Sequence, residues 1–118
     1  MKSLFISVAA ALLALQPAYA AEPQSMIRLA LAEGQASGSV DGPVADETRK
    51  RLNATGNLTL AVKRLYRYEQ AGCARLQLDF AQDAALLPGK SVPAPYAWST
   101  QMNICADGHP PSNLKRRD

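Results

Sequence analysis

The sequence predicts an α+β domain, in which two short N-terminal helices pack on a three-stranded antiparallel sheet with one disulfide. Residues 72–80 alternate between apolar and polar side chains, as a half-buried β-strand does, and residues 96–105 repeat this pattern. The only two cysteines are Cys73, at the start of the first stretch, and Cys105, at the end of the second. An even number of cysteines in an exported chain predicts that they form one disulfide.

The N-terminus is typical of a secretory signal peptide. Lys2 precedes an apolar run over residues 4–15, and the small-x-small sequence Ala-Tyr-Ala at residues 18–20 provides a cleavage site. The run is shorter than the roughly 20 apolar residues of a transmembrane helix, so a retained membrane anchor is the weaker alternative. We therefore predict a signal peptide over residues 1–20, cleavage after Ala20, a periplasmic or secreted protein, and no stable membrane insertion after cleavage.

The mature chain of about one hundred residues fits a single domain over residues 21–105 followed by a flexible basic tail over residues 106–118. The formal net charge of the whole chain is only +3. Basic residues cluster at 49–51 and at 115–117, which is more typical of a solvated face and tail than of a nucleic-acid site. We expect no nucleic acid as a partner.

The first part of the domain predicts two helices. Apolar residues recur at helical spacing within residues 21–34, and Gly34 suits the end of a helix. The apolar face of this helix either covers the sheet or docks on a partner protein, and we favour the sheet because a small domain needs its apolar surface for the core. After a glycine-rich loop at residues 34–42, Pro43 begins a second helix that ends near Asn53.

The central part predicts strands, with one ambiguity. Residues 58–69 fit either a strand or a helix, and we choose the strand because residues 70–72 form a turn before the next strand. Residues 82–95 contain three prolines and one Pro-Gly pair, which predicts a long irregular connection with a helical turn at its start. The third strand covers residues 96–105.

The disulfide predicts the register of the last two strands if they are antiparallel neighbours. The pairs on the apolar face are then Ala74 with Ile104, Leu76 with Met102, Leu78 with Thr100, and Phe80 with Trp98. The polar pairs on the other face are Arg75 with Asn103, Gln77 with Gln101, and Asp79 with Ser99. A slip by one residue would place apolar residues against polar ones. A bulge or an end pair is the alternative, because a disulfide directly across paired strands is geometrically demanding.

The residues with reactive side chains do not form a catalytic set. His109, the only histidine, precedes two prolines outside the expected elements and has no nucleophile motif beside it. Asp79 and Asp83 lie close in sequence without an expected cleft. Two cysteines and one histidine do not make a four-ligand metal site, and the sequence has no glycine-rich phosphate loop. We expect no catalytic, cofactor-binding or metal-binding residues. No set of residues supports a third hypothesis, that of a small hydrolase.

The aromatic residues are the clearest candidates for a binding surface. The alternation predicts that they gather on one face of the sheet, and tyrosine and tryptophan anchor many protein interfaces. We expect most of this face to be core, and any part that the helices leave uncovered to bind a partner. The candidate surface consists of Tyr66, Tyr68, Tyr96 and Trp98, with Phe80 on the same face and Arg75 at the sheet margin.

Residues 72–76 (Gly-Cys-Ala-Arg-Leu) and 101–108 (Gln-Met-Asn-Ile-Cys-Ala-Asp-Gly), after a signal peptide and short helices, resemble small periplasmic accessory proteins encoded with bacterial conjugation and type IV secretion machinery. The resemblance covers the C-terminal half and includes no diagnostic functional motif. It implies a non-enzymatic role beside an envelope machine and a protein partner in the envelope, and it transfers no site residues. The alternative is an inhibitor or immunity-type protein that blocks an envelope enzyme through the loop at residues 86–95, because binding residues often lie on loops.

Overall fold

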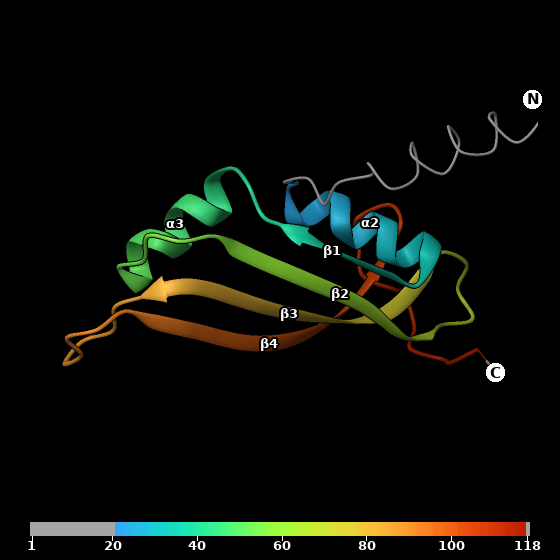
Figure 1. Cartoon of the computed structure of the whole chain (residues 1–118). Coiled ribbons are helices and arrows are strands. Elements are labelled where there is room, and N and C mark those ends of the chain that lie inside the picture. The colour runs from blue at the N-terminus through green and yellow to red at the C-terminus, as the bar shows by residue number, and fades with distance from the viewer. Residues whose placement is uncertain (1–20, 118) are drawn as a thin grey trace, which may run out of the picture.

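The computed structural model describes residues 21–117, which form a four-stranded antiparallel sheet with two helices on one of its faces (Figure 1). The elements are α2 (Pro23–Glu33), β1 (Gln35–Ser39), α3 (Pro43–Leu52), β2 (Leu58–Arg67), β3 (Cys73–Ala85) and β4 (Ala94–Cys105). The strands lie in the order β1-β2-β3-β4, so each one pairs with its neighbour in sequence. The α+β class is confirmed, and the expected signal peptide at residues 1–20 lies outside the described residues.

Both helices form where the sequence predicts them. Pro23 and Pro43 each open a helix, at a position where the missing N–H costs no intrahelical hydrogen bond. Gly34 ends α2 in a left-handed conformation with a φ of 98°, which glycine adopts without strain. Asn53 ends α3 in the same region of backbone space. A proline at the start and a left-handed residue at the end thus delimit both helices through local sequence.

The core lies between the helices and the sheet. The apolar face of α2 is buried there through Met26 and Ala30, as expected for a helix that covers the sheet. The strands contribute alternate residues that are almost fully buried: Leu58, Leu60, Val62, Ala74, Leu76 and Leu78. Burying one large aliphatic side chain contributes about 1.5–3 kcal/mol, so this face supplies most of the stabilisation of the domain.

The register of β3 and β4 confirms the expected pairing residue by residue. Cys73 lies opposite Cys105, and a disulfide joins the two. From this pair the register runs without a shift to Phe80 opposite Trp98. The apolar pairs lie on the helix side of the sheet and the polar pairs on the other side, so strand alternation and one covalent link determine both strands.

The sheet has four strands, which corrects the expected three. Residues 35–39 fall in the stretch whose glycine content predicts a loop, yet they form β1 and pair antiparallel with β2. Small and polar side chains give this segment little intrinsic preference for a strand. It becomes one because α2 packs on it and β2 satisfies its backbone, with Ala36 opposite Val62 and Gly38 opposite Leu60.

The expected helical turn after β3 is also wrong, because the strand continues to Ala85. The pairing of β3 with β4 is irregular between Gln82 and Ala85. The Gln82 side chain is fully buried there, and its Nε2 donates hydrogen bonds to the carbonyl oxygens of Gly56 and Asp83 at 2.9 and 3.0 Å. These bonds tie the end of β3 to the segment that precedes β2.

The C-terminal residues lie beside the turn between β2 and β3. The Glu69 N–H donates to the Lys115 carbonyl at 2.8 Å, and the Arg117 N–H donates to the Arg67 carbonyl at 2.9 Å. The Lys115 ammonium lies 3.7 Å from the Glu69 carboxylate. These contacts bring the basic end of the chain against the end of β2.

Candidate functional site

The face of the sheet opposite the helices carries the candidate site, and we call it the open face. Neither helix covers it, as Figure 1 shows. Its side chains are the alternate strand residues that the core does not use, and most of them are small or polar. From β1 to β4, the first row is Ser39, Thr59, Ala81 and Ala97, the second is Ser37, Ala61, Asp79 and Ser99, and the third is Gln35, Lys63, Gln77 and Gln101.

The first two rows form a shallow depression of about 580 Å³ that spans all four strands. A second depression of about 440 Å³ adjoins it along β1 and β2 and shares Ser37, Ala61 and Asp79 with it. Serine, alanine and threonine side chains are short, so another chain can come close to the sheet here. The open face therefore offers an extended shelf and not a deep pocket.

Asp79 is the acidic group on this shelf. Its carboxylate accepts hydrogen bonds from the Ser99 hydroxyl and from Gln77 Nε2, the second at 3.0 Å. These hydrogen bonds, with that from Ser99 first, hold the pKa of Asp79 below its ordinary value, and the nearby Lys63 acts in the same direction. The carboxylate is therefore charged and held in a fixed position at neutral pH.

A β-bulge in β2 brings Tyr66 and Tyr68 to the open face. The pairing with β3 shifts between Arg64 and Tyr66, so Leu65 is an extra residue and the alternation reverses after it. Tyr66 therefore lies opposite Arg75, on the other face from the apolar residues of the same strand. The rings of Tyr66 and Tyr68 meet edge to face, with their centroids 5.5 Å apart.

Arg75 is held on the open face by two amide side chains. Its Nε donates to Gln101 Oε1 and its Nη1 donates to Asn103 Oδ1, each at 2.8 Å. The same oxygen of Asn103 accepts a hydrogen bond from the Tyr68 hydroxyl at 2.6 Å. Burial, the largest cause, and the neighbouring Tyr66 raise the pKa of Tyr68, so its hydroxyl stays a donor. Among residues 21–117, no carboxylate forms an ion pair with Arg75.

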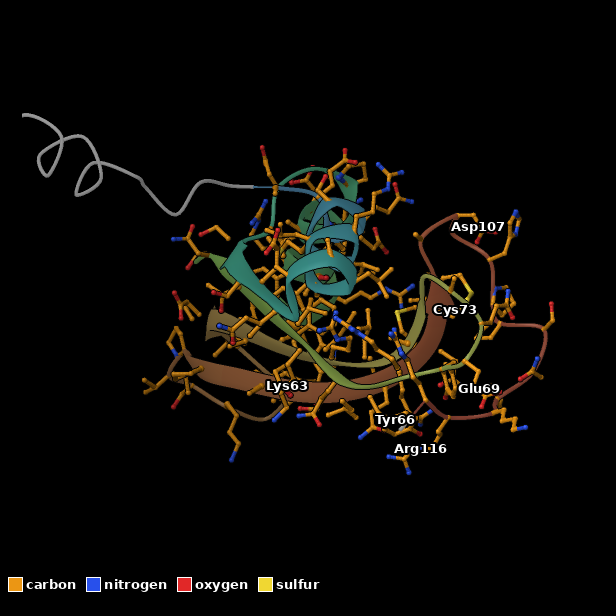
Figure 2. All side chains as sticks on the ribbon, turned by 90° about the vertical axis from the view of Figure 1, so that its right-hand side faces the viewer. Lys63, Tyr66, Glu69, Cys73, Asp107 and Arg116 are labelled. Carbon is orange, nitrogen blue, oxygen red and sulfur yellow. A yellow bond between two sulfur atoms is a disulfide. The ribbon has the colours of Figure 1, made fainter. Side chains whose placement is uncertain are left out.

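Arg116 completes this end of the face. Its guanidinium carbon lies 3.7 Å from the centre of the Tyr66 ring, in a cation–π contact. Figure 2 shows Tyr66 and Arg116 together on the side of the sheet opposite α2. We call Tyr66, Tyr68, Arg75 and Arg116 the cationic patch. Sequence reasoning missed Arg116, because a basic run at residues 115–117 indicates only a solvated tail.

The remaining residues of the expected surface lie elsewhere. Trp98 is on the helix side of the sheet, where its ring stacks on that of Phe80 with centroids 5.1 Å apart. The Tyr96 ring lies 5.7 Å from that of Trp98. The expectation that all the aromatic residues share one face is therefore wrong, because the bulge in β2 separates them into two groups.

The arrangement offers charge, hydrogen bonds and shape, and within residues 21–117 the histidine lies apart from the hydroxyl and carboxylate of the open face. The Ser99 hydroxyl meets Asp79, whereas His109 lies in the turn after β4, where its N–H donates to the Asp107 carboxylate at 2.9 Å. Cys73, at that end of the sheet, and Asp79 are separated by about 20 Å of extended strand. Within the described part of the chain, no three His, Cys, Asp or Glu side chains lie close enough to hold a metal ion.

No helix within residues 21–117 combines the length and the apolar character needed to cross a membrane. No protein-family model, no curated protein and no solved structure matches this chain. The open face is therefore interpreted from its own geometry and charge.

Proposed function

We propose that this chain is a non-enzymatic, exported interaction protein that binds an acidic segment of an envelope protein along the open face, as an accessory of a conjugation or type IV secretion apparatus. The observation that carries the proposal is Arg75, a cation oriented by two neutral amides on a sheet face that no helix covers. The apparatus is suggested by the resemblance of the C-terminal half to such accessory proteins.

The geometry of Arg75 supports a carboxylate as its ligand. Gln101 and Asn103 fix the guanidinium but leave its charge uncompensated. A guanidinium binds a carboxylate in a planar, two-pronged geometry, and a side chain that is already ordered loses less conformational entropy on binding. Arg116 adds a second positive charge at the same end of the face. An acidic side chain of the partner would therefore bind in the cationic patch.

Asp79 gives the partner an orientation. It lies on the same strand and face as Arg75, about 13 Å away along extended backbone. A fixed negative charge repels the acidic part of a partner and attracts a basic or amide donor. The partner segment therefore has its acidic end over the cationic patch and a donor over the shelf of small residues.

Two features support export. The N-terminal residues are typical of a signal peptide, and the cysteines of the domain are paired. Structural disulfides form and persist mainly in oxidising compartments such as the periplasm. An envelope component is therefore the class of partner that the mature chain would meet.

Site-specific photocrosslinking in the host cell tests the proposal. A photoreactive amino acid replaces Ala61 on the open face or, as a control, Leu29, which is 48% exposed on α2. We expect position 61 to capture a component of the transfer or secretion apparatus, identified by mass spectrometry, and position 29 to capture none.

Two charge reversals sharpen the test. Arg75→Glu should reduce the capture at position 61 by about tenfold, because it places a carboxylate where the partner's carboxylate binds. Arg28→Glu makes the same change on the exposed surface of α2 and should leave the capture unchanged. An unchanged yield of crosslinked partner in the Arg75→Glu variant would contradict binding at the open face. Capture of proteins unrelated to such machinery would contradict the accessory role.

A second candidate function is inhibition of an envelope enzyme through the loop between β3 and β4. This loop extends beyond the sheet at the end distant from the disulfide (Figure 1). Val92 in the loop is 71% exposed, and no atom would contact a Cβ at Gly89. A photoreactive residue at position 92 that captures a single enzyme, together with loss of inhibition when residues 86–93 are replaced by a Gly-Ser linker, would favour this function.

A further inference from the structure

The outer edge of β4 is an unusual feature of the sheet. Within residues 21–117, β4 pairs only with β3, so one whole side of a long strand lacks a partner strand. Natural edge strands are protected by charged residues, by prolines, by bulges or by being short. Ala94–Cys105 contains no charged residue, and its register is continuous from Tyr96 to the disulfide.

The hydrogen-bond phase of β4 shows which backbone groups face outward. The Ala106 N–H donates to the Gly72 carbonyl, so the pair next to the disulfide is a hydrogen-bonded pair. Such pairs alternate along an antiparallel ladder, so the even-numbered residues of β4 bond to β3. The odd-numbered residues therefore point their N–H and C=O groups away from the sheet. The Cys105 N–H agrees with this phase, because it donates outward to the His109 carbonyl.

Both ends of this edge are closed. At one end the turn after β4 uses the outward N–H of Cys105. At the other end Pro95 has no N–H to offer. The residues with free outward groups are those between them: Ala97, Ser99, Gln101 and Asn103. Thr100 lies at the centre of this set.

We propose that the edge of β4 binds a second copy of this chain, with the two β4 strands antiparallel around a two-fold axis at Thr100. In that register Ala97 pairs with Asn103 of the other copy, and Ser99 with Gln101. Every free outward group is then used, in about eight main-chain hydrogen bonds. A register centred on Gln101 would set Ala97 against Cys105, whose N–H is already bonded, so the axis at Thr100 is the one that the backbone favours.

The side chains also match in this register. Trp98 lies opposite Met102 of the other copy, and Tyr96 lies opposite Ile104, so aromatic residues meet aliphatic ones across the new pair. Neither copy brings a charge to the strand, so the symmetric pairing creates no repulsion between identical residues. Tyr96, now 39% exposed, would lose much of its exposure.

A closed dimer fits better than an open chain of molecules. The other edge of the sheet is β1, which is much shorter than β4, and its end is extended by Ala21, which bridges Val40 on the outer side. A pairing of β4 with β1 of the next molecule would therefore leave most of β4 unpaired. Pairing of β4 with itself closes after two copies. This inference does not depend on the proposed function of the open face.

A charge-swap experiment on the oxidised mature chain tests the dimer. On the axis, Thr100 of one copy lies opposite Thr100 of the other copy, with about 4.5 Å between their Cα atoms. Thr100→Lys and Thr100→Glu should each weaken the dimer by about tenfold, because each places identical charges together. An equimolar mixture of the two should restore dimers that contain one of each. Sedimentation velocity at about 10–200 μM gives the mass, and native mass spectrometry gives the composition of the mixed dimer.

Thr59→Lys is the matched control, because it makes the same change at an exposed position of a central strand and should leave the dimer intact. A wild-type chain that stays monomeric throughout this range would overturn the proposal, and the edge would then serve another protein or none. Single variants that remain as dimeric as the wild type would place the interface elsewhere. Failure of the mixture to restore dimers would exclude the axis at Thr100.

Discussion

On β3, Leu76 is fully buried beneath the helices, whereas its neighbour Gln77 points to the open face and is only partly buried. The same contrast holds along the whole sheet. The helix side holds large aliphatic residues in close contact, and the open side holds short or polar residues around Asp79 and the cationic patch. Because successive residues alternate between faces, one set of strands carries two surfaces of different chemistry.

The open face is free to bind because its side chains are not needed for the core. Burial on the helix side stabilises the sheet, so substitutions there should unfold the domain. Substitutions on the open face should change binding and leave the fold intact. The disulfide is the exception, because it is the one covalent constraint on the open side of the strands.

Removal of the disulfide should have the largest effect on the free energy of unfolding. Replacing both cysteines, Cys73→Ser with Cys105→Ser, removes a link between residues 32 positions apart. The chain-entropy model gives a loss of about 3–4 kcal/mol in the free energy of unfolding, measured by urea denaturation under oxidising conditions. The wild type in reducing buffer should lose a similar amount, and an unchanged midpoint in the double variant would show that β3 and β4 do not need the link.

The next effect compares the two faces directly. Leu76→Ala should lower the free energy of unfolding by about 3 kcal/mol, because it leaves a cavity under α2. Gln77→Ala, one residue away on the open face, should change it by less than about 0.5 kcal/mol. Thermal or urea unfolding of both variants measures the difference. Equal losses in the two variants would mean that the faces are not independent.

A smaller effect should follow from removing the chain after Asn113. The truncation deletes two backbone hydrogen bonds to the end of β2 and the contact of Arg116 with Tyr66. We expect a loss of about 1 kcal/mol and faster hydrogen exchange at the Glu69 N–H. Lys115→Gln breaks only an exposed ion pair and should have almost no effect. Unprotected exchange at Glu69 in the intact chain would support the flexible tail that the sequence predicts.

The smallest effect concerns Asp79 and appears only in acid. Hydrogen bonds from Ser99 and Gln77 lower the pKa of this carboxyl in the folded chain, so the unfolded chain binds the proton first as the pH falls. The stabilisation is present above the pKa of the unfolded state and is lost as the pH falls through the lower folded value. Asp79→Asn should therefore flatten the acid side of the stability curve below about pH 4. Parallel curves for wild type and variant between about pH 2 and 6 would exclude this contribution.

The sequence predicts the parts of the fold that depend on local signals. Proline, glycine and asparagine at the helix ends locate α2 and α3, and strict alternation with one disulfide locates β3 against β4. β1 could not be found in this way, because Gln-Ala-Ser-Gly-Ser carries no strand signal and becomes a strand only through contacts with β2 and α2.

Only part of the candidate site could be predicted, because the rest of it also depends on contacts between distant segments. Tyr66, Tyr68 and Arg75 do come together, but Tyr96 and Trp98 lie on the other side of the sheet. An unbroken alternation would place all of these aromatic residues on one face. The bulge breaks it, and the local sequence does not indicate the bulge. Arg116 joins the site through a backbone bridge to Tyr68, the residue after β2, which the charge pattern of the tail does not encode.

The bulge at Leu65 shows how β2 accommodates one residue more than its pairing with β3 needs. Before it, the even-numbered residues of β2 lie on the helix side, and after it Tyr66 and Tyr68 lie on the open face. Deletion of this single residue would remove the bulge and leave Tyr66 opposite Arg75 and Arg67 opposite Ala74, each on the face it occupies now. The bulge thus absorbs one inserted residue in β2 without moving the side chains on either side of it to the other face.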